Sequence, residues 1–363
     1  MLRHSSDNEP GYSRKRIRTA WAYFDAEGNR ITDREEIDRL NAIGLPPAYE
    51  QAWFCADPNG HLQATGIDAR GRKQYRYHAD FRQNRDTAKY EGLLEFGKAL
   101  PRLRRRVEQD LKRRKLARET VLAAIVRLLD TQYIRVGNEQ YAKDNKSFGA
   151  TTLRSRHVRA TGQKLMMRFA GKHGIVHEVK ITDSNLKRVV RRCQELPGQM
   201  LFQYVDESGE ARPITSSDVN AYIKEASGGD FSAKHFRTWA ASVIAFDQML
   251  KKADDARITV KTVVEPVAEA LGNTPAISRK SYVHPVLLEA VKESARDPLD
   301  GMDRPRARKW LSSSEVGLLE FLARGGKRKR RRIAQPEPAR DAATTGQQAA
   351  TRERPELEAE AAA

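Results

Sequence analysis

The spacing of hydrophobic positions changes near residue 86 of this chain. Before that point, short runs of aromatic and β-branched side chains alternate with turn residues, as in Trp21–Phe24, Ala52–Cys55 and His61–Gly66. One stretch, Asp33–Ala42, has the composition of a short helix. The pattern predicts a small β-rich domain over residues 1–85.

Beyond residue 86 the apolar positions take helical spacing. Leu103, Val107 and Leu111 recur four residues apart, and a second apolar stripe covers Val121–Leu129. Arginines and lysines crowd around the first stripe between Arg102 and Lys115. We therefore expect two helices, each with one face buried, whose basic faces hold phosphates or face solvent.

A stretch of β-structure interrupts the helices between about residues 151 and 181. Apolar side chains alternate from Leu165 to Phe169 and again from Ile175 to Ile181, which is the period of a strand. The turn signal Gly171–Gly174 lies between them. The pattern predicts a hairpin with Lys172 at its tip.

Helical patterns resume after the hairpin. We expect one helix over Asp218–Glu225, capped by Ser216 or Ser217, and another over about Ala233–Lys251. Ser312–Ala323 reads as a last capped helix.

The chain ends in a basic run, Lys327–Arg332, and an Ala/Glu/Pro/Gln-rich tail that we expect to be disordered. The predicted fold class is therefore α+β. It comprises a β-rich N-terminal domain (1–85), a mainly α-helical domain with a β-hairpin or three-stranded sheet (86–311), and a short helix, basic run and tail (312–363).

Charge points to nucleic acid as the partner. The 363 residues include 66 lysines and arginines against 48 aspartates and glutamates, a net charge of +18. Such an excess attracts polyanions, whereas a surface charged only for solubility has a more even balance. No apolar run approaches the roughly 20 residues that span a bilayer, so no membrane partner is expected.

Familiar cofactor sites are missing from the sequence. It has no GxxxxGK[ST] phosphate loop and no HExxH motif, so we expect no nucleotide cofactor and no metal. Cys55 and Cys193 stand far apart, which argues against a zinc site or a disulfide framework and suggests a reducing, cytoplasmic compartment.

Four segments carry the remaining candidate chemistry. Each alone has an ordinary structural explanation: Arg135 can pair with Glu139 one turn away, a lysine in a turn is usually solvated, and Tyr282 can be a packing residue. The segments are Tyr133–Glu139, Gly171–Gly174, Lys234–Trp239, and Leu271–Pro275 running on to Ser281–Pro285.

Taken together and in this order, the four segments resemble the catalytic core of the type IB DNA topoisomerases, which share a catalytic superfamily with the tyrosine recombinases. The likeness is to the short bacterial and poxvirus-like branch. Gly60–Gly66 and Gly71–His78 also look like that branch, and the resemblance covers about residues 17–300. The catalytic residues it implies are Arg135, Lys172, Arg237, Asn273 and the nucleophile Tyr282; many family members have His in place of Asn273.

The resemblance implies an isomerase that cuts one strand of duplex DNA through a 3′-phosphotyrosyl link, lets supercoils relax and reseals the strand without ATP or an obligatory metal. Two fixed arginines suit the charge of the transition state, and a lysine can protonate the leaving oxygen.

We also expect DNA contacts outside the catalytic set. Interleaved aromatic and basic residues can touch bases and phosphates, although tyrosines of a strand can equally pack inward. The protein would clamp the duplex as a monomer associated with the nucleoid, with the basic run as a possible tether. The candidate DNA-binding residues are Gln63, Arg72, Lys73, Tyr75, Tyr77, Lys234 and His235.

Two alternatives stay open. A site-specific tyrosine recombinase would use the same chemistry on two duplexes as a tetramer, but such enzymes usually begin with a helical domain rather than a β-rich one. A catalytically silent DNA-binding protein would explain the charge equally well.

Overall fold

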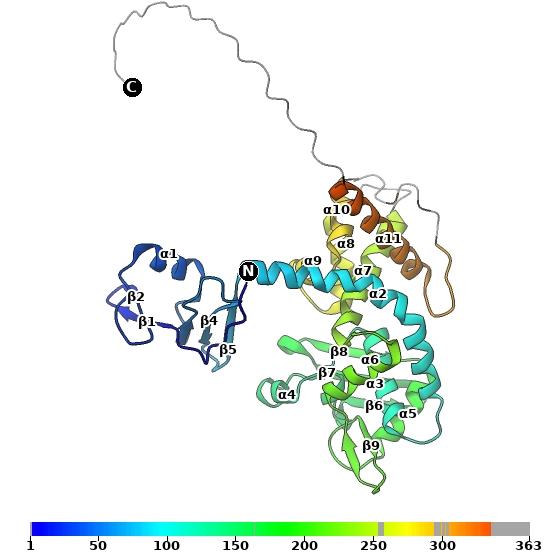
Figure 1. Cartoon of the computed structure of the whole chain (residues 1–363). Coiled ribbons are helices and arrows are strands. Elements are labelled where there is room, and N and C mark those ends of the chain that lie inside the picture. The colour runs from blue at the N-terminus through cyan, green and yellow to red at the C-terminus, as the bar shows by residue number, and fades with distance from the viewer. Residues whose placement is uncertain are drawn as a thin grey trace, which may run out of the picture. The chain divides into compact units, whose positions relative to one another are not determined.

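The computed structural model describes residues 2–162, 164–252, 258–293, 299, 302 and 305–334. The chain divides into two compact units, Met1–Ala323 and Arg324–Ala363. The first unit contains an antiparallel five-stranded sheet with order β2-β1-β3-β4-β5 and a three-stranded sheet with order β6-β7-β8 (Figure 1). The strands are β1 (Tyr12–Ile17), β2 (Ala20–Phe24), β3 (Glu50–Phe54), β4 (Leu62–Ile67), β5 (Lys73–Tyr77), β6 (Val158–Thr161), β7 (Lys164–Ala170), β8 (Val176–Ile181), β9 (Gln203–Val205) and β10 (Ala211–Pro213).

The α-helices follow the expected order. They are α1 (Arg34–Ala42), α2 (Ala79–Leu111), α3 (Arg118–Gln132), α4 (Glu139–Asn145), α5 (Ser184–Gln194), α6 (Ser216–Ser227), α7 (Ala233–Lys252), α8 (Val260–Leu271), α9 (Pro275–Ser281), α10 (Pro285–Glu293) and α11 (Ser313–Ala334). The predicted α+β class, with a β-rich N-terminal sheet and a helical region after it, is confirmed.

The N-terminal sheet forms where the short apolar runs predicted strands. The predicted helix in this region is α1, and it begins at Asp33, whose carboxylate accepts a hydrogen bond from the Glu35 amide at 3.0 Å. Leu40 of α1 packs in a buried cluster with Tyr23 and Phe54 from the sheet. This small cluster is the core of the N-terminal region.

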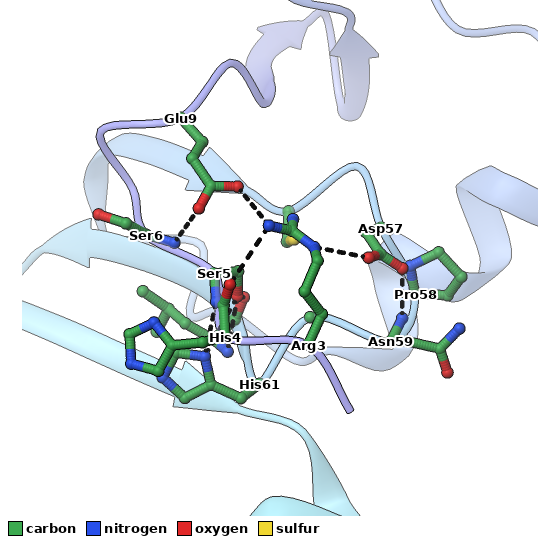
Figure 2. A network of polar contacts seen from close by, with 12 residues as sticks. Arg3, His4, Ser5, Ser6, Glu9, Asp57, Pro58, Asn59 and His61 are labelled. Carbon is green, nitrogen blue, oxygen red and sulfur yellow. Dashed lines mark hydrogen bonds and ion pairs between the residues drawn. The ribbon is translucent and has the colours of Figure 1, made fainter. Parts of the chain in front are cut away.

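The segment before β1 docks against the start of β4 (Figure 2). Arg3 pairs with Asp57 at 2.9 Å, and the Ser5 amide donates a hydrogen bond to Nδ1 of His61 at 2.9 Å. The ring of His4 stacks on that of His61, with centroids 4.1 Å apart. The first residues therefore belong to the folded N-terminal region rather than to a loose arm.

The two predicted amphipathic helices are α2 and α3. Leu103, Val107 and Leu111 of α2 are buried in one core with the apolar stripe of α3, as the four-residue spacing required. Helix α2 begins at Ala79, so the change of pattern near residue 86 falls inside a helix. The break in periodicity therefore does not mark the start of the helix.

Several basic residues around the first stripe pair with carboxylates of the protein. Arg104 lies between Asp130 and Glu315, at 2.8 and 2.7 Å, and Arg106 pairs with buried Asp110 at 2.7 Å. The expectation that these basic faces hold phosphates or face solvent is wrong for Arg104, whereas Arg106 pairs with a carboxylate and stays partly exposed. Their carboxylate partners are supplied partly by distant segments, which the local pattern cannot reveal.

The predicted hairpin is β7 and β8. Side chains of β7 alternate between buried and exposed, and Leu165 pairs with Ile181 across the hairpin. Strand β6 adds a third strand on the other edge of β7. The connecting turn places Lys172, which is exposed, at the tip as expected.

One helix cap differs from the prediction. Helix α6 is capped by Thr215 and not by Ser216 or Ser217. The Thr215 hydroxyl accepts from the Asp218 amide at 3.2 Å, and the Asp218 carboxylate accepts from the Thr215 amide at 2.8 Å. This reciprocal pair needs an acidic residue three positions after the cap, which Asp218 is for Thr215.

The end of the chain is described only in part. Helix α11 follows a Ser312 cap, whose hydroxyl accepts from the Glu315 amide at 3.2 Å, as predicted. The tail over residues 335–363, and the side chains of Lys327–Arg332, lie outside the described residues. No helix in the described ranges has the length and apolar character needed to cross a membrane.

Candidate active site

Two short helices carry Asn273 and Tyr282. Helix α8 ends at Gly272, which has the left-handed φ of 59° that stops a helix. The next helix, α9, starts at once because the Thr274 hydroxyl accepts from the Ile277 amide. Tyr282 is the C-cap of α9, with its amide bonded to the Ser278 carbonyl at 3.1 Å. The helix stop at Gly272 thus places Asn273 in the turn that leads to the tyrosine.

Arg135 follows the end of α3 in an extended segment held by a second turn. The Ala150 amide donates to the Arg135 carbonyl at 2.8 Å, and the Thr151 amide donates to the Val136 carbonyl at 2.7 Å. A Cβ on Gly149 would lie 2.6 Å from the Arg135 carbonyl oxygen. Glycine at position 149 therefore allows the close approach that fixes the Arg135 backbone.

Arg237 lies on α7 and ties these two segments together. Its residue is only 4 % exposed. One guanidinium nitrogen donates to the carbonyl of Tyr133, at the end of α3, and the other donates to the carbonyl of Leu271, at the end of α8, at 2.9 Å. Arg237 thereby brings the segment of Arg135 next to the turn of Asn273.

Four of the five predicted catalytic side chains meet. Nη2 of Arg135 lies 3.2 Å from Oδ1 of Asn273 and 3.5 Å from the hydroxyl oxygen of Tyr282. Cζ of Arg237 lies 5.1 Å from the centre of the Tyr282 ring. Nδ2 of Asn273 and Nε of Arg237 are buried donors without a hydrogen-bond partner among the residues that the structure describes. Buried polar groups normally have partners, so these two donors mark a place for an absent acceptor.

The electrostatics favour an ionised tyrosine. Burial by itself raises the pKa of Tyr282, but the charges of Arg237 and Arg135 and their hydrogen bonds outweigh it and hold that pKa below its ordinary value. Burial and the charge of Arg135 lower the pKa of Arg237. Neither arginine has a carboxylate partner among the described residues, and Glu139 pairs with Lys143 at 3.2 Å instead of Arg135.

Lys172 is the fifth predicted residue. It lies in the tight turn Lys172–Gly174, closed by a hydrogen bond from the Gly171 amide to the Ile175 carbonyl at 2.7 Å. No hydrogen bond or ion pair joins the exposed lysine to the other four side chains, all of which are described. The hairpin, rather than the lysine itself, is what contacts the rest of the site.

Two further residues next to the site were not predicted. Nζ of Lys89, on α2, donates to the Ser281 carbonyl and lies 5.6 Å from the centre of the Tyr282 ring. His177, on β8, lies between the Lys172 hairpin and Gly272. Nothing in the sequence singles out Lys89. His177 stands at a register position where β8 otherwise buries Val179 and Ile181, so a polar residue on an apolar face was the available signal.

Three candidate DNA-binding residues of the N-terminal sheet are held by internal contacts. Gln63 is buried, with Nε2 donating to the Gly60 carbonyl at 2.7 Å and Oε1 accepting from Arg39 at 3.0 Å. Arg72 pairs with Asp68 at 2.7 Å, and Lys73 pairs with Asp7. The amide of Gln63 shapes its own loop, while the two cations would have to exchange a carboxylate for a phosphate.

The aromatic candidates of β5, Tyr75 and Tyr77, stack on each other but differ in their other contacts. Tyr75 is 48 % exposed and stacks on Tyr77, with centroids 6.2 Å apart, while Tyr77 also packs beside Phe81. Tyr75 is therefore partly exposed, with Nζ of Lys73 lying 6.0 Å from the centre of its ring.

The two candidates on α7 also differ from each other. Lys234 is exposed. The His235 ring contacts Phe96 and Phe231, and its Nδ1 accepts from the Ser232 amide at 3.0 Å. Lys234 can reach a ligand, whereas His235 caps and packs its own helix.

No group of three or more His, Cys, Asp or Glu side chains in the described part of the chain is arranged to hold a metal ion. The site is instead built from two arginines, an amide and a phenol, a set that suits an anion with several oxygens.

Comparison with known proteins agrees with this geometry. The family model for the catalytic core of eukaryotic DNA topoisomerase I matches residues 78–299, and the model for the N-terminal domain of bacterial DNA topoisomerase IB matches residues 20–68. DNA topoisomerase 1B of Acanthamoeba polyphaga mimivirus is 30% identical over 80% of this chain and 92% of its own length. DNA topoisomerase I of Monkeypox virus and DNA topoisomerase 1B of Vaccinia virus (strain Copenhagen) are each 24% identical over 68% of this chain and 76% of their own length. The chain therefore belongs to the type IB DNA topoisomerases, in their poxvirus-like branch.

Proposed function

We propose that this DNA topoisomerase relaxes supercoiled duplex DNA by cutting and rejoining one strand with Tyr282 as the nucleophile. The proposal rests on one observation: the side chains of Arg135, Asn273, Arg237 and Tyr282 lie close together. Two of them, Asn273 and Arg237, each keep a buried donor that has no partner among the described residues. A backbone phosphate supplies the acceptor oxygens that these donors lack. Neither ATP nor a metal takes part, because one phosphodiester replaces another of similar energy.

The cleavage step exchanges two P–O bonds. The phenolate oxygen of Tyr282 attacks the phosphorus in line, a Tyr–O–P bond forms, and the bond from phosphorus to the 5′ oxygen breaks. The phenol proton leaves to solvent, and Lys172 gives a proton to the departing 5′ oxygen. Tyr282 stays on the 3′ phosphate while the free 5′ end rotates, and the reverse reaction reseals the strand.

The transition state is bound by two cationic donors and one neutral donor. Negative charge gathers on the nonbridging oxygens as Tyr282 attacks. Arg135 and Arg237 supply fixed charges for these oxygens, and Nδ2 of Asn273 supplies a hydrogen bond. The same two arginines favour the phenolate of Tyr282 before attack. The same two guanidinium groups therefore act on both the phosphate and the phenol of Tyr282.

The role of Lys172 has a direct test. Lys172→Ala should slow cleavage of normal DNA by roughly 10²–10⁴-fold, the usual worth of a general acid. A substrate with sulfur in place of the 5′ bridging oxygen leaves without a proton, so it should restore most of the rate. Equal losses on both substrates would remove Lys172 from this role.

Duplex binding extends beyond the site in this proposal. The β-rich part, residues 1–85, and the catalytic part, residues 86–311, close on the duplex as a monomeric clamp. Exposed Lys234 and the partly exposed ring of Tyr75 are the best placed of the predicted contacts. Arg72, Lys73 and Tyr77 act beside them, while Gln63 and His235 hold the local structure. Its substrate would keep the enzyme with the nucleoid.

The nucleophile is tested by substitution and by trapping. Tyr282→Phe should abolish relaxation of plasmid DNA, in buffer with EDTA and without ATP, and leave duplex binding intact. Tyr204→Phe, a half-buried tyrosine of β9, is the matched control and should relax plasmid like the unaltered enzyme. Denaturant added during the reaction should trap a covalent adduct whose peptide maps to Tyr282.

The same assays separate the rivals. A site-specific recombinase would act only on DNA with paired recognition sites and would leave an arbitrary plasmid supercoiled. A silent DNA-binding protein would form no adduct, and Tyr282→Phe would change nothing. Relaxation of arbitrary plasmid together with the mapped adduct contradicts both.

A further inference from the structure

His177 occupies an unusual place on the sheet that carries Lys172. It pairs with Phe169 across the hairpin and shares a face of β8 with buried Val179 and Ile181. Its ring stacks on that of Phe169, with centroids 5.2 Å apart and planes 20° from parallel. The imidazole therefore occupies a position at which the strand pattern predicts an aliphatic side chain.

The ring fills the space over the base of the Lys172 turn. A Cβ built on Gly171 would lie 2.5 Å from both Cδ2 and Nε2 of His177, closer than two such atoms can approach. Gly171 has φ −88° and ψ −164°, an extended conformation open to any residue. The backbone does not demand glycine there, so the His177 ring is what demands it.

The opposite edge of the ring faces the turn before Asn273. A Cβ on Gly272 would lie 3.4 Å from Cε1 of His177 and 3.7 Å from Cγ2 of Ile175. The ring thus lies between the glycine that precedes Lys172 and the glycine that precedes Asn273. The ring therefore faces Gly272 across a space that one added methyl group would fill, beside the turn that leads to the nucleophile.

We propose that His177 is a positioning residue that docks the Lys172 hairpin onto the Gly272–Asn273 turn, so that the proton donor and the phosphate-binding amide reach one phosphodiester together. This inference rests on the proposed roles of Lys172 and Asn273. The flat shape of the ring, and not a proton of its own, does the work.

The surroundings of the ring support an uncharged imidazole. Burial lowers the pKa of His177, and the charges of Arg237 and Arg135 lower it further. Within the described part of the chain, the charged groups that act on this ring are the two arginines. The ring is therefore neutral at neutral pH and able to pack closely between the two glycines.

The first test removes or keeps the ring. His177→Ala should slow single-turnover cleavage of normal DNA on the order of 10²-fold, the effect of a catalytic group displaced by about 1 Å. On the substrate with a 5′ bridging sulfur the loss should shrink to roughly tenfold or less, because protonation no longer matters. His177→Phe keeps a flat ring on Phe169 and should restore most of the rate. Glu178→Ala, on the exposed face of the same strand, is the matched control.

The second test uses Gly171 to probe the same contact from the other side. Gly171→Ala alone should slow cleavage about tenfold or more, because the methyl group collides with the ring and displaces the Lys172 turn. In the double variant Gly171→Ala, His177→Ala the methyl group has room. The double variant should cleave no more slowly than His177→Ala alone, a non-additivity expected only for residues in contact.

Each result decides the matter. Full rate in His177→Ala, or strictly additive losses in the double variant, would overturn the proposal. A His177→Phe variant as slow as His177→Ala would show that the imidazole transfers a proton instead. An equal loss of His177→Ala on both substrates would overturn the link to Lys172. Failure of the proposed function looks different, because the unaltered enzyme would then form no adduct at Tyr282.

Discussion

Two buried arginines of this enzyme have opposite surroundings. Arg104 on α2 lies between the carboxylates of Asp130 and Glu315, at 2.8 and 2.7 Å. Arg237 on α7 donates to two main-chain carbonyls, lacks a carboxylate partner among the described residues, and has Arg135, another cation, as a charged neighbour. The same side chain is neutralised by the protein in one place and left uncompensated in the other.

The pKa shifts follow these surroundings. Burial lowers the pKa of Arg104, but the two carboxylates outweigh it and raise that pKa above its ordinary value. Burial and Arg135 both lower the pKa of Arg237. Removing a cation from carboxylates that it neutralises destabilises the fold, whereas a cation that the fold leaves without a carboxylate is available to a phosphate.

The two regions are joined through α7. Trp239, two residues after Arg237, donates from Nε1 to Oε1 of Glu315 at 3.0 Å. Glu315 is also a partner of Arg104. The neutralised region therefore anchors the helix that presents Arg237, which suggests a division of labour between stability and catalysis that substitutions can separate.

The largest effect on stability should come from Arg104→Ala. It leaves the carboxylates of Asp130 and Glu315 without a cation, and loss of one partner of such an ion pair typically costs about 3–5 kcal/mol of unfolding free energy. Chemical denaturation monitored by tryptophan fluorescence would measure it. Arg105→Ala, at the next, exposed position of α2, should change stability by no more than about 0.5 kcal/mol. Equal stabilities of the two variants would contradict the comparison.

Arg237→Ala should reverse the balance. Loss of one preorganised donor typically raises the barrier by about 2.7–4 kcal/mol, or roughly 10²–10³-fold in single-turnover cleavage. The unfolding free energy should fall less than in Arg104→Ala, because no carboxylate is left unpaired. Arg237→Lys keeps the charge without the fork and should recover only part of the rate. A stability loss as large as that of Arg104→Ala, with cleavage unchanged, would show that Arg237 is structural.

A smaller effect is expected at Lys89 of α2, which contacts the end of α9, next to the proposed nucleophile. Lys89→Ala removes the donor to the Ser281 carbonyl, and we expect cleavage to slow about tenfold, equivalent to about 1.4 kcal/mol of barrier. The loss should appear equally on substrates with oxygen or sulfur as the leaving atom, because Lys89 holds the tyrosine and not the proton donor. A greater recovery of rate on the sulfur substrate would contradict this role and connect Lys89 with protonation of the leaving group.

The last prediction concerns pH. The folded pKa of Tyr282 is lowered, so the stability it contributes is complete above its ordinary pKa of about 10 and is lost as the pH falls through the folded value. Arg135→Ala should raise that pKa, since burial then meets only the charge of Arg237. The ultraviolet absorbance of tyrosinate, taken as the difference between each protein and its Tyr282→Phe counterpart, measures the shift. An unchanged titration would show that Arg135 does not act on the phenol.

Much of the fold could be predicted from local pattern. Alternation located β7 and β8, four-residue spacing located the buried face of α2, and the Ser312 cap located α11. One prediction failed where a boundary depended on reciprocal bonds, as at Thr215. Hydrophobic periodicity shows which residues of a helix or strand are buried, and these residues stop short of the ends of the element.

The candidate site was predicted as a set of residues but not as a geometry. The order of the four segments identified Arg135, Arg237, Asn273 and Tyr282, which the fold brings together. Lys89 was missed because a lone lysine on a basic helix carries no distinguishing mark.

By itself, the sequence determined which functional groups are available: a basic chain, a tyrosine, arginines, a lysine in a tight turn and no phosphate loop. Only the tertiary structure decided which cations are neutralised and which stay open. Arg104 finds a carboxylate from Glu315, 211 residues away, and the ring of His177 faces Gly272 across the site. Charges and rings act over a few ångströms in space, and separation along the chain says nothing about that distance.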